Sequence, residues 1–138
     1  MTDLTPKQIE DWLASSPFIS FMKLELLDFD PEKGEIAMKM PMRPEFERGG
    51  GSGQFHGGPI AALIDTVGDF AVAIKVKGGV PTINFRVDYL RPSGGSYLIA
   101  RATARRVGRT VGVVDIYVLD DQDRLTAVGR GCYGAQVG

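Results

Sequence analysis

The spacing of hydrophobic and polar residues separates one long helical segment from the rest of the chain. Between residues 59 and 76, apolar side chains recur every three or four residues, which places them along one face of an α-helix. Pro59 opens the segment and two glycines follow it, as is usual at helix ends. The opposite face consists mainly of small residues and carries Asp65 and Asp69. The pattern predicts a long helix whose second face also packs closely against another surface.

Six further segments predict β-strands, some through the two-residue alternation of apolar and polar residues and one through its content of Val, Ile and Tyr. In the second of them, Ile36, Met38 and Met40 lie on one face, while Glu35 and Lys39 lie on the other. Short turns rich in Gly, Pro and Asp connect most neighbouring segments, which favours antiparallel pairing. The predicted strands cover residues 22–30, 34–42, 80–90, 96–107, 110–119 and 124–134.

The two remaining segments differ from each other. Residues 5–14 predict a short amphipathic helix that Thr5 caps, and the Ser-Ser-Pro sequence at 15–17 ends it. Residues 43–58 show no periodicity and contain a glycine-rich run at 49–53, so they predict a long, flexible connection. Connections of this kind often carry functional residues.

The order of these elements predicts an α+β fold. One amphipathic helix cannot cover both faces of a six-stranded sheet, so the simplest arrangement wraps the sheet around the helix. No repeat or linker divides the 138 residues, which predicts a single domain over 1–138 with a helical N-terminal extension over 1–17. Two copies are expected to pair and to cover the surface that one copy leaves exposed.

Composition narrows the classes of partner. The 16 basic and 17 acidic residues nearly cancel, which gives no support for nucleic-acid binding. No apolar run approaches the roughly 20 residues that span a bilayer, and the polar N-terminus does not resemble a secretory signal. The single cysteine, Cys132, cannot form an intrachain disulfide. We expect a cytoplasmic protein without membrane or nucleic-acid partners.

The histidine content narrows the candidate chemistry. His56 is the only histidine, so one chain cannot form a zinc site of the HExxH type, and no metal is expected. No serine carries the GxSxG signature of a nucleophile elbow. Carboxylates therefore remain as the main candidates for hydrolytic chemistry.

Three short motifs resemble those of one enzyme family. Residues 55–65 read Phe-His-Gly-Gly-Pro-Ile-Ala-Ala-Leu-Ile-Asp and resemble the HGGxxxxLxD signature of hotdog-fold acyl-CoA thioesterases of the phenylacetate-degradation (PaaI-like) type. Residues 87–92 resemble the strand of that family that ends in Tyr-x-x-Pro, and residues 105–110 resemble its basic, glycine-containing corner. The likeness runs from about residue 20 to residue 135 in the order of the elements.

This resemblance implies a hotdog fold, in which an antiparallel sheet of about six strands wraps around one long central helix. It implies hydrolysis of an acyl-CoA thioester to a free acid and coenzyme A. No cofactor is expected, because coenzyme A is part of the substrate. It also implies a homo-oligomer, either a dimer or a dimer of dimers, with active sites between protomers.

The chemistry requires an attacking group and donors for the developing oxyanion. Gly57 and Gly58 lead into the predicted helix, where backbone N–H groups point outward and the helix dipole is positive. We predict that the Gly58 N–H is the oxyanion donor and that Gly57 shapes the approach to it. Asp65, nine residues after His56, is expected to act as nucleophile or as general base on water.

Three more residues are assigned supporting roles. The resemblance, aligned from Pro92, places Thr82 where related enzymes have a small hydroxyl residue that orients water. It also implies that His56 orients its loop rather than transferring protons. Asp69 lies one turn after Asp65 on the same helix face, where it is expected to contact substrate or to act on Asp65 through its like charge.

Binding of coenzyme A requires cations for its three phosphates. Gln54 and Phe55, next to the histidine, are expected to contact the substrate. Four arginines at or near strand ends are candidates for the phosphates: Arg91, Arg105, Arg106 and Arg109.

One departure from the family keeps alternatives open. Related sequences usually carry Asn or Gln six residues before the histidine, where this chain has Gly50, and Gln54 or Ser52 would have to replace it. A non-catalytic hotdog protein that binds acyl-CoA is therefore the main alternative. A hotdog dehydratase or hydratase ranks last, because it needs a catalytic histidine paired with an acid, and His56 lies in the loop before the helix.

Overall fold

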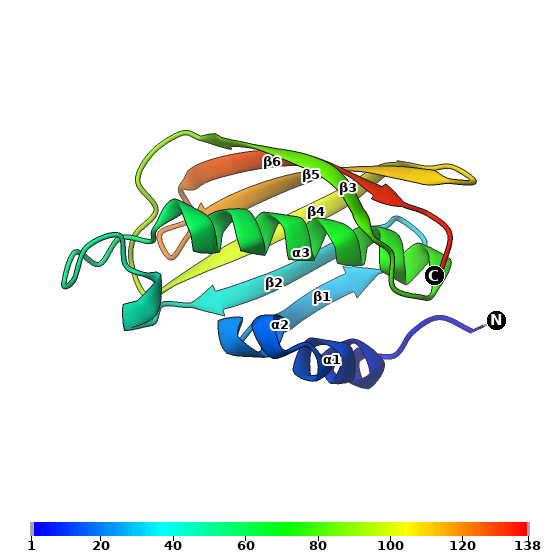
Figure 1. The fold of residues 1–138 in the computed structure, drawn as a ribbon, viewed down its shortest axis with the longest axis horizontal. Helices are drawn as coiled ribbons and strands as arrows, with labels where there is room; N and C mark the ends of the chain where they lie inside the picture. The colour runs from blue at the N-terminus through cyan, green and yellow to red at the C-terminus, as the bar shows by residue number, and fades with distance from the viewer. Residues whose placement is uncertain (1, 138) are drawn as a thin grey trace.

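The computed structural model describes residues 2–137 and contains one long helix, six strands and short helical segments (Figure 1). The long helix α3 is Gly57–Val76. The remaining elements are α1 (Pro6–Ser15), α2 (Pro17–Met22), β1 (Glu25–Asp30), β2 (Glu35–Pro41), the 3-10 turn η1 (Pro44–Phe46), β3 (Thr82–Tyr89), β4 (Tyr97–Val107), β5 (Val111–Asp120) and β6 (Leu125–Gly134).

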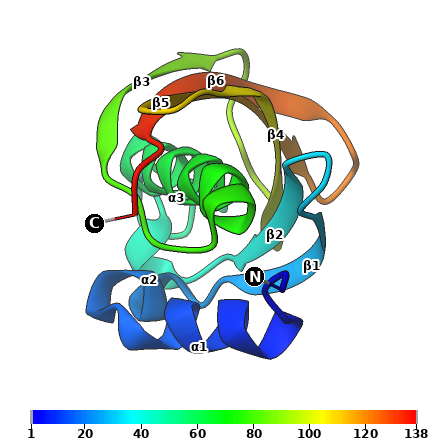
Figure 2. The same ribbon diagram turned by 90° about the vertical axis from the view of Figure 1, so that its right-hand side faces the viewer.

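The six strands form one antiparallel sheet in the order β1-β2-β4-β5-β6-β3. Seen end-on, the sheet curls around α3, which lies in its concave side (Figure 2). The predicted apolar stripe of α3 faces this sheet, and Ile60, Leu63 and Ile74 are almost fully buried. In β4 the predicted alternation also holds, and Ala100 pairs with the fully buried Met38 of β2. In β2 the predicted apolar face is buried, but Ala37 between Ile36 and Met38 is buried as well. The predicted α+β hotdog architecture is confirmed.

The N-terminal region contains a helix that the sequence pattern did not predict. The Ser-Ser-Pro sequence does end α1, whose cap by Thr5 is confirmed, but the chain then forms α2 directly. Ser16 ends the first helix and caps the second, because its side chain accepts a hydrogen bond from the N–H of Ile19. Lys23 adopts the left-handed conformation that ends α2. The first strand therefore begins at Glu25 rather than at residue 22.

The segment between β2 and α3 folds back on itself, so that its last residues bond to residues near its beginning. The N–H of His56 donates to the carbonyl of Phe46 at 2.7 Å, and the N–H of Phe55 donates to Ser93 O at 2.7 Å. Both phenylalanines are 3% exposed. The Glu47 carboxylate accepts backbone N–H groups from the glycine-rich tip. These bonds bring the residues before α3 against the segment after β3.

The two edge strands of the sheet differ in what covers them. The β1 edge lies beside α1 and α2 (Figure 2). The β3 edge carries large apolar side chains that are exposed in one chain, with Ile83 at 55% and Tyr89 at 52%. Exposed apolar residues on an edge strand mark a surface that another chain can cover. Within residues 2–137, no helix has the length and apolar character needed to cross a membrane.

Candidate active site

The start of α3 is fixed by the only histidine. His56 caps the helix, and its Nδ1 accepts a hydrogen bond from the N–H of Gly58 at 2.9 Å. The helix therefore begins at Gly57, two residues before the predicted start at Pro59. Because Nδ1 acts as an acceptor, this contact requires that nitrogen to be unprotonated. His56 thus holds the backbone at the helix start.

Tyr89 fixes the same peptide group from its other side. Its hydroxyl donates to the carbonyl oxygen of Gly57 at 2.9 Å. A Cβ on Gly57 would lie 3.2 Å from that hydroxyl, so glycine permits the close approach. The peptide between Gly57 and Gly58 is thereby held at both its C=O and its N–H. These contacts leave the N–H of Gly57 itself free of either partner.

A cavity of about 700 Å³ lies at this helix start. Its wall combines apolar side chains with two arginines and the helix-start backbone. The lining residues are Arg48, Phe55, His56, Gly57, Gly58, Ile60, Tyr89, Leu90, Arg91, Pro92 and Ser93. This volume lies within the range of small-molecule sites.

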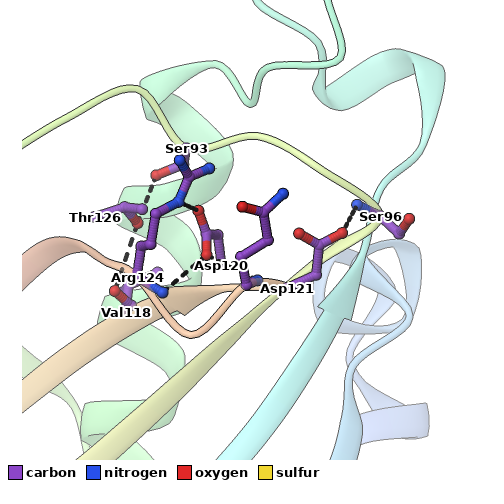
Figure 3. Close-up of polar contacts among 8 residues, drawn as sticks. Ser93, Ser96, Val118, Asp120, Asp121, Arg124 and Thr126 are labelled. Atoms are coloured by element: carbon purple, nitrogen blue, oxygen red, sulfur yellow. Dashed lines mark hydrogen bonds and ion pairs between the residues drawn. The ribbon is translucent and has the colours of Figure 1, made fainter.

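Polar contacts anchor the segment after β3, which includes the cavity-lining residue Ser93 (Figure 3). The Ser93 hydroxyl donates to Thr126 Oγ1 at 2.8 Å, and both residues are almost fully buried. The carboxylate of Asp121 accepts the N–H of Ser96 at 2.8 Å. Asp120, which is 1% exposed, binds Arg124 within the β5–β6 turn at 2.8 Å. The segment after β3 is thus fixed to the β5–β6 turn.

Asp65 lies further along the helix, and one strand contacts its carboxylate while another contacts its backbone carbonyl. Thr82 Oγ1 donates to Asp65 Oδ1 at 2.8 Å, so the structure brings these two predicted residues together. The hydroxyl of Tyr133 donates to the Asp65 carbonyl oxygen at 3.2 Å. Thr82 and Tyr133 are cross-strand partners on β3 and β6.

Sequence reasoning missed Tyr133. Its ring passes close to the helix backbone because Gly68 offers no side chain: a Cβ there would lie 2.3 Å from the tyrosine hydroxyl. Burial, followed by the charges of Asp65 and Asp69, raises the pKa of Tyr133, so the hydroxyl stays protonated and can donate. A glycine within the helix, three residues after Asp65, was the signal available in the sequence.

The carboxyl group of Asp69 has a raised pKa. Burial and then the negative charge of Asp65 raise the pKa of Asp69 to about 7. Phe70 beside it contacts Trp12 of α1, with ring centroids 6.2 Å apart. The N-terminal helices thus cover this part of α3.

A second cavity, of about 220 Å³, contains both carboxyl groups. It lies between α2, α3 and the start of β3, and it does not include the helix-start residues. Its lining residues are Ile19, Asp65, Thr66, Asp69, Phe70 and Thr82.

The comparison with known families identifies the superfamily of the chain. Residues 52–127 match the family model of the thioesterase superfamily. The chain belongs to this superfamily. Both the capped helix start and Asp65 fall within the matched residues.

Relatives of this thioesterase-superfamily chain support the same assignment. A candidate esterase of Halobacterium salinarum is 37% identical over 136 residues, covering 91% of this chain and 88% of that protein. The acyl-coenzyme A thioesterase PaaI of Escherichia coli is 36% identical over 78 residues, or 55% of this chain and 54% of that protein. A solved thioesterase of Haemophilus influenzae has a TM-score of 0.84 at 26% identity, covering 96% and 91% of the two chains. These findings support a PaaI-like hydrolase that acts on thioesters.

The four predicted phosphate-binding arginines of this thioesterase-superfamily chain lie in two places. Arg91 lines the helix-start cavity. Arg105 is bound to Asp115 at 2.8 Å. Arg106 and Arg109 lie near the β4–β5 turn, at the opposite end of the sheet from the start of α3 (Figure 1). Within one chain, only the first of the four adjoins the candidate site.

The other residues that were predicted to contact substrate also lie in different places. Phe55 lines the helix-start cavity, whereas the Gln54 side chain accepts a hydrogen bond from Arg48 at 3.0 Å. Gly50 is exposed, and a Cβ there would meet no atom within 4 Å. The Ser52 hydroxyl bonds the backbone of its own loop. In one chain, neither suggested substitute for the missing amide side chain lines the cavity.

Proposed function

We propose that this protein hydrolyses acyl-CoA thioesters and that the Asp65 carboxylate drives the attack. The observation that carries this proposal is the position of that carboxylate in the chain of a thioesterase-superfamily member. Asp65 faces a small cavity and is oriented by Thr82 at 2.8 Å. A carboxylate fixed in this way can act on a carbonyl carbon placed in the cavity.

Two forms of attack are consistent with a single carboxylate. As a general base, Asp65 takes a proton from water, and the resulting hydroxide adds to the thioester carbon. As a nucleophile, it forms a mixed anhydride that water then cleaves. In both, the C–S bond breaks, the thiolate of coenzyme A leaves and takes up a proton, and the free acid is released.

The oxyanion formed during attack needs donors already in place. The Gly58 N–H, which the motif suggested first, is occupied by His56. We therefore assign the main role to the N–H of Gly57, with Tyr89 and His56 holding the neighbouring peptide rigid. The helix dipole adds positive potential at the same point.

The distance along α3 supports a site shared between two copies. Gly57 and Asp65 are eight residues apart, which is roughly 12 Å at 1.5 Å per residue. An oxyanion and the carbon that bears it cannot meet both groups of one helix. A second copy, paired through the exposed β3 edge, would bring its own Gly57 toward Asp65. The proposed assembly is a homodimer or a dimer of dimers.

The larger cavity suits coenzyme A. It has apolar walls for the pantetheine arm, and Arg48 and Arg91 line it as candidate phosphate ligands. Asp69, with its carboxyl group in the smaller cavity, is assigned to the acyl side. Roles for Arg105, Arg106 and Arg109 would require substrate that reaches the far end of the sheet.

The position of Gly50 favours one alternative, a protein that binds acyl-CoA without turnover. Neither Gln54 nor Ser52 supplies an amide or hydroxyl to the helix-start cavity in one chain. Such a protein would keep its affinity for acyl-CoA when Asp65 is changed.

The test is free-thiol release from a panel of aryl and aliphatic acyl-CoAs by wild type and Asp65→Asn. The variant keeps the side-chain size but loses the attacking charge, so kcat should fall by about 100-fold to 10,000-fold. Asp28→Asn, on exposed β1, serves as the control and should match wild type. Binding of acyl-CoA by wild type without thiol release above background would overturn the proposal in favour of the binding protein.

A further inference from the structure

The two cavities differ enough in size to indicate which of them holds the coenzyme A part of an acyl-CoA and which holds the acyl group. If Asp65 acts on the thioester carbon, the acyl group bonded to that carbon must lie beside Asp65. Coenzyme A, with its nucleotide and three phosphates, cannot enter a space of about 220 Å³. The acyl group is then the arm that occupies it. A dry cavity of about 150 Å³ suffices for benzene, so a compact aryl or short acyl group fits here.

Ile19 forms the far wall of this cavity. The same side chain also lines a second space of about 410 Å³ between α1, α2 and β1. It is the one residue common to the two linings within the described chain. The outer space is lined by Glu10, Leu13, Ala14, Ile19, Ser20, Lys23, Leu24, Glu25 and Leu26. Ile19 therefore separates the carboxylate cavity from a groove that could hold more chain.

The helix that carries Ile19 is firmly attached, so its side chain is a fixed wall. The Arg43 guanidinium lies over the ring of Phe21, 4.0 Å from its centroid, and also donates to the Phe21 carbonyl. Phe21 packs edge-on against Phe46 at 5.7 Å between centroids. Met22, at the end of α2, is fully buried. These contacts join α2 to the chain that follows β2.

We propose that Ile19 sets the upper size of the acyl group and that the preferred substrates carry compact aryl or short acyl groups. This inference rests on the proposed thioesterase function. Truncating Ile19 would join the two spaces and let a longer acyl chain pass into the groove. Enlarging it would shorten the cavity.

The test is kcat/KM measured over a series of straight-chain acyl-CoAs from butyryl to dodecanoyl, together with benzoyl-CoA. Wild type should prefer the compact substrates. Ile19→Ala should raise the decanoyl-to-butyryl ratio of kcat/KM by about tenfold or more, the size of effect that pocket methylenes give. Leu24→Ala, which alters the groove but not the carboxylate cavity, is the matched control and should leave the ratio unchanged.

Ile19→Phe provides a second route if the alanine variant does not fold, and it should lower the hexanoyl-to-butyryl ratio. Folded Ile19 variants with the wild-type length profile would overturn the inference while leaving the thioesterase proposal intact. A result that contradicts both proposals is distinguishable, because wild type would then release no thiol from any acyl-CoA. Wild type that already prefers dodecanoyl-CoA would also contradict the compact cavity.

Discussion

The start of α3 and the region around Asp65 and Asp69 differ in the groups that they offer a substrate. At the start, the Gly57 N–H precedes the peptide that His56 and Tyr89 hold, and it offers a donor at the positive end of the helix dipole beside a cavity of about 700 Å³. Two turns later, Asp65 and Asp69 present carboxyl groups in a cavity of about 220 Å³. One end suits a developing negative charge and a large ligand arm, and the other suits attack and a small arm.

The comparison supports the proposal that one chain holds two complementary halves of a site rather than a whole site. A rigid helix keeps the halves about 12 Å apart, so they cannot close on one thioester. The exposed apolar β3 edge, which carries Thr82 at its start, offers the surface through which a second copy could approach. In the proposed dimer, the helix would act as a fixed spacer between parts that serve different copies.

Removing one hydroxyl from each half should separate their contributions. Thr82→Val deletes the hydrogen bond to a charged carboxylate and should lower kcat by about tenfold with little change in KM. Tyr89→Phe deletes a hydrogen bond between neutral groups and should lower kcat only about threefold. Steady-state kinetics on one acyl-CoA measures both. Equal losses from the two variants would contradict the assignment of the stronger, charge-assisted contact to Asp65.

Asp69 allows a test that does not depend on activity. Its pKa of about 7 in the folded protein lies above the ordinary value of 3.8 expected on unfolding. The unfolded chain therefore loses this proton first, and the group's contribution to stability is lost as pH rises from about 4 through 7. Over that window it should lower the free energy of unfolding by up to about 1.4 kcal/mol per pH unit.

Asp69→Asn removes this titration. Denaturant unfolding at pH 5 and pH 8 should show the asparagine variant gaining stability relative to wild type at the higher pH. Asp11→Asn, an exposed carboxyl on α1, is the control. An unchanged difference between Asp69→Asn and wild type at the two pH values would show that Asp69 titrates normally.

Much of the fold was predictable because it depends on local periodicity. The stripe of α3 and the alternation in β4 were confirmed, since burial on one face leaves a direct trace in the sequence. The helix α2 was missed because Ser16 both ends one helix and caps the next. The sequence pattern around Ser16 was interpreted only as the end of a helix, although the same residue also begins the next helix.

The site was predictable only in part. Asp65, Thr82, His56 and the glycines follow from a motif, and the structure brings Asp65 and Thr82 into contact. Tyr133 could not be found in this way, because its contact with Asp65 depends on the pairing of β3 with β6. The occupied Gly58 N–H was equally hidden, since it depends on the rotamer of His56.

The central claim, that each site takes its carboxylate from one copy and its helix start from another, can be tested by mixing two inactive variants. Asp65→Asn removes the carboxylate. Gly57→Pro removes the proposed oxyanion N–H, and the extended conformation of His56 before it, at φ −62° and ψ 151°, suits a proline at this first helical position. Because a Cβ at residue 57 would lie 3.2 Å from the Tyr89 hydroxyl, this change is made together with Tyr89→Phe, which removes that hydroxyl.

The measurement is thiol release by the two variants produced together in equal amounts, with separate tags to confirm mixed dimers. Half of randomly formed dimers are mixed, and each would hold one intact site, so we predict about a quarter of the wild-type rate. Mixed dimers that remain as inactive as either parent would contradict the shared site.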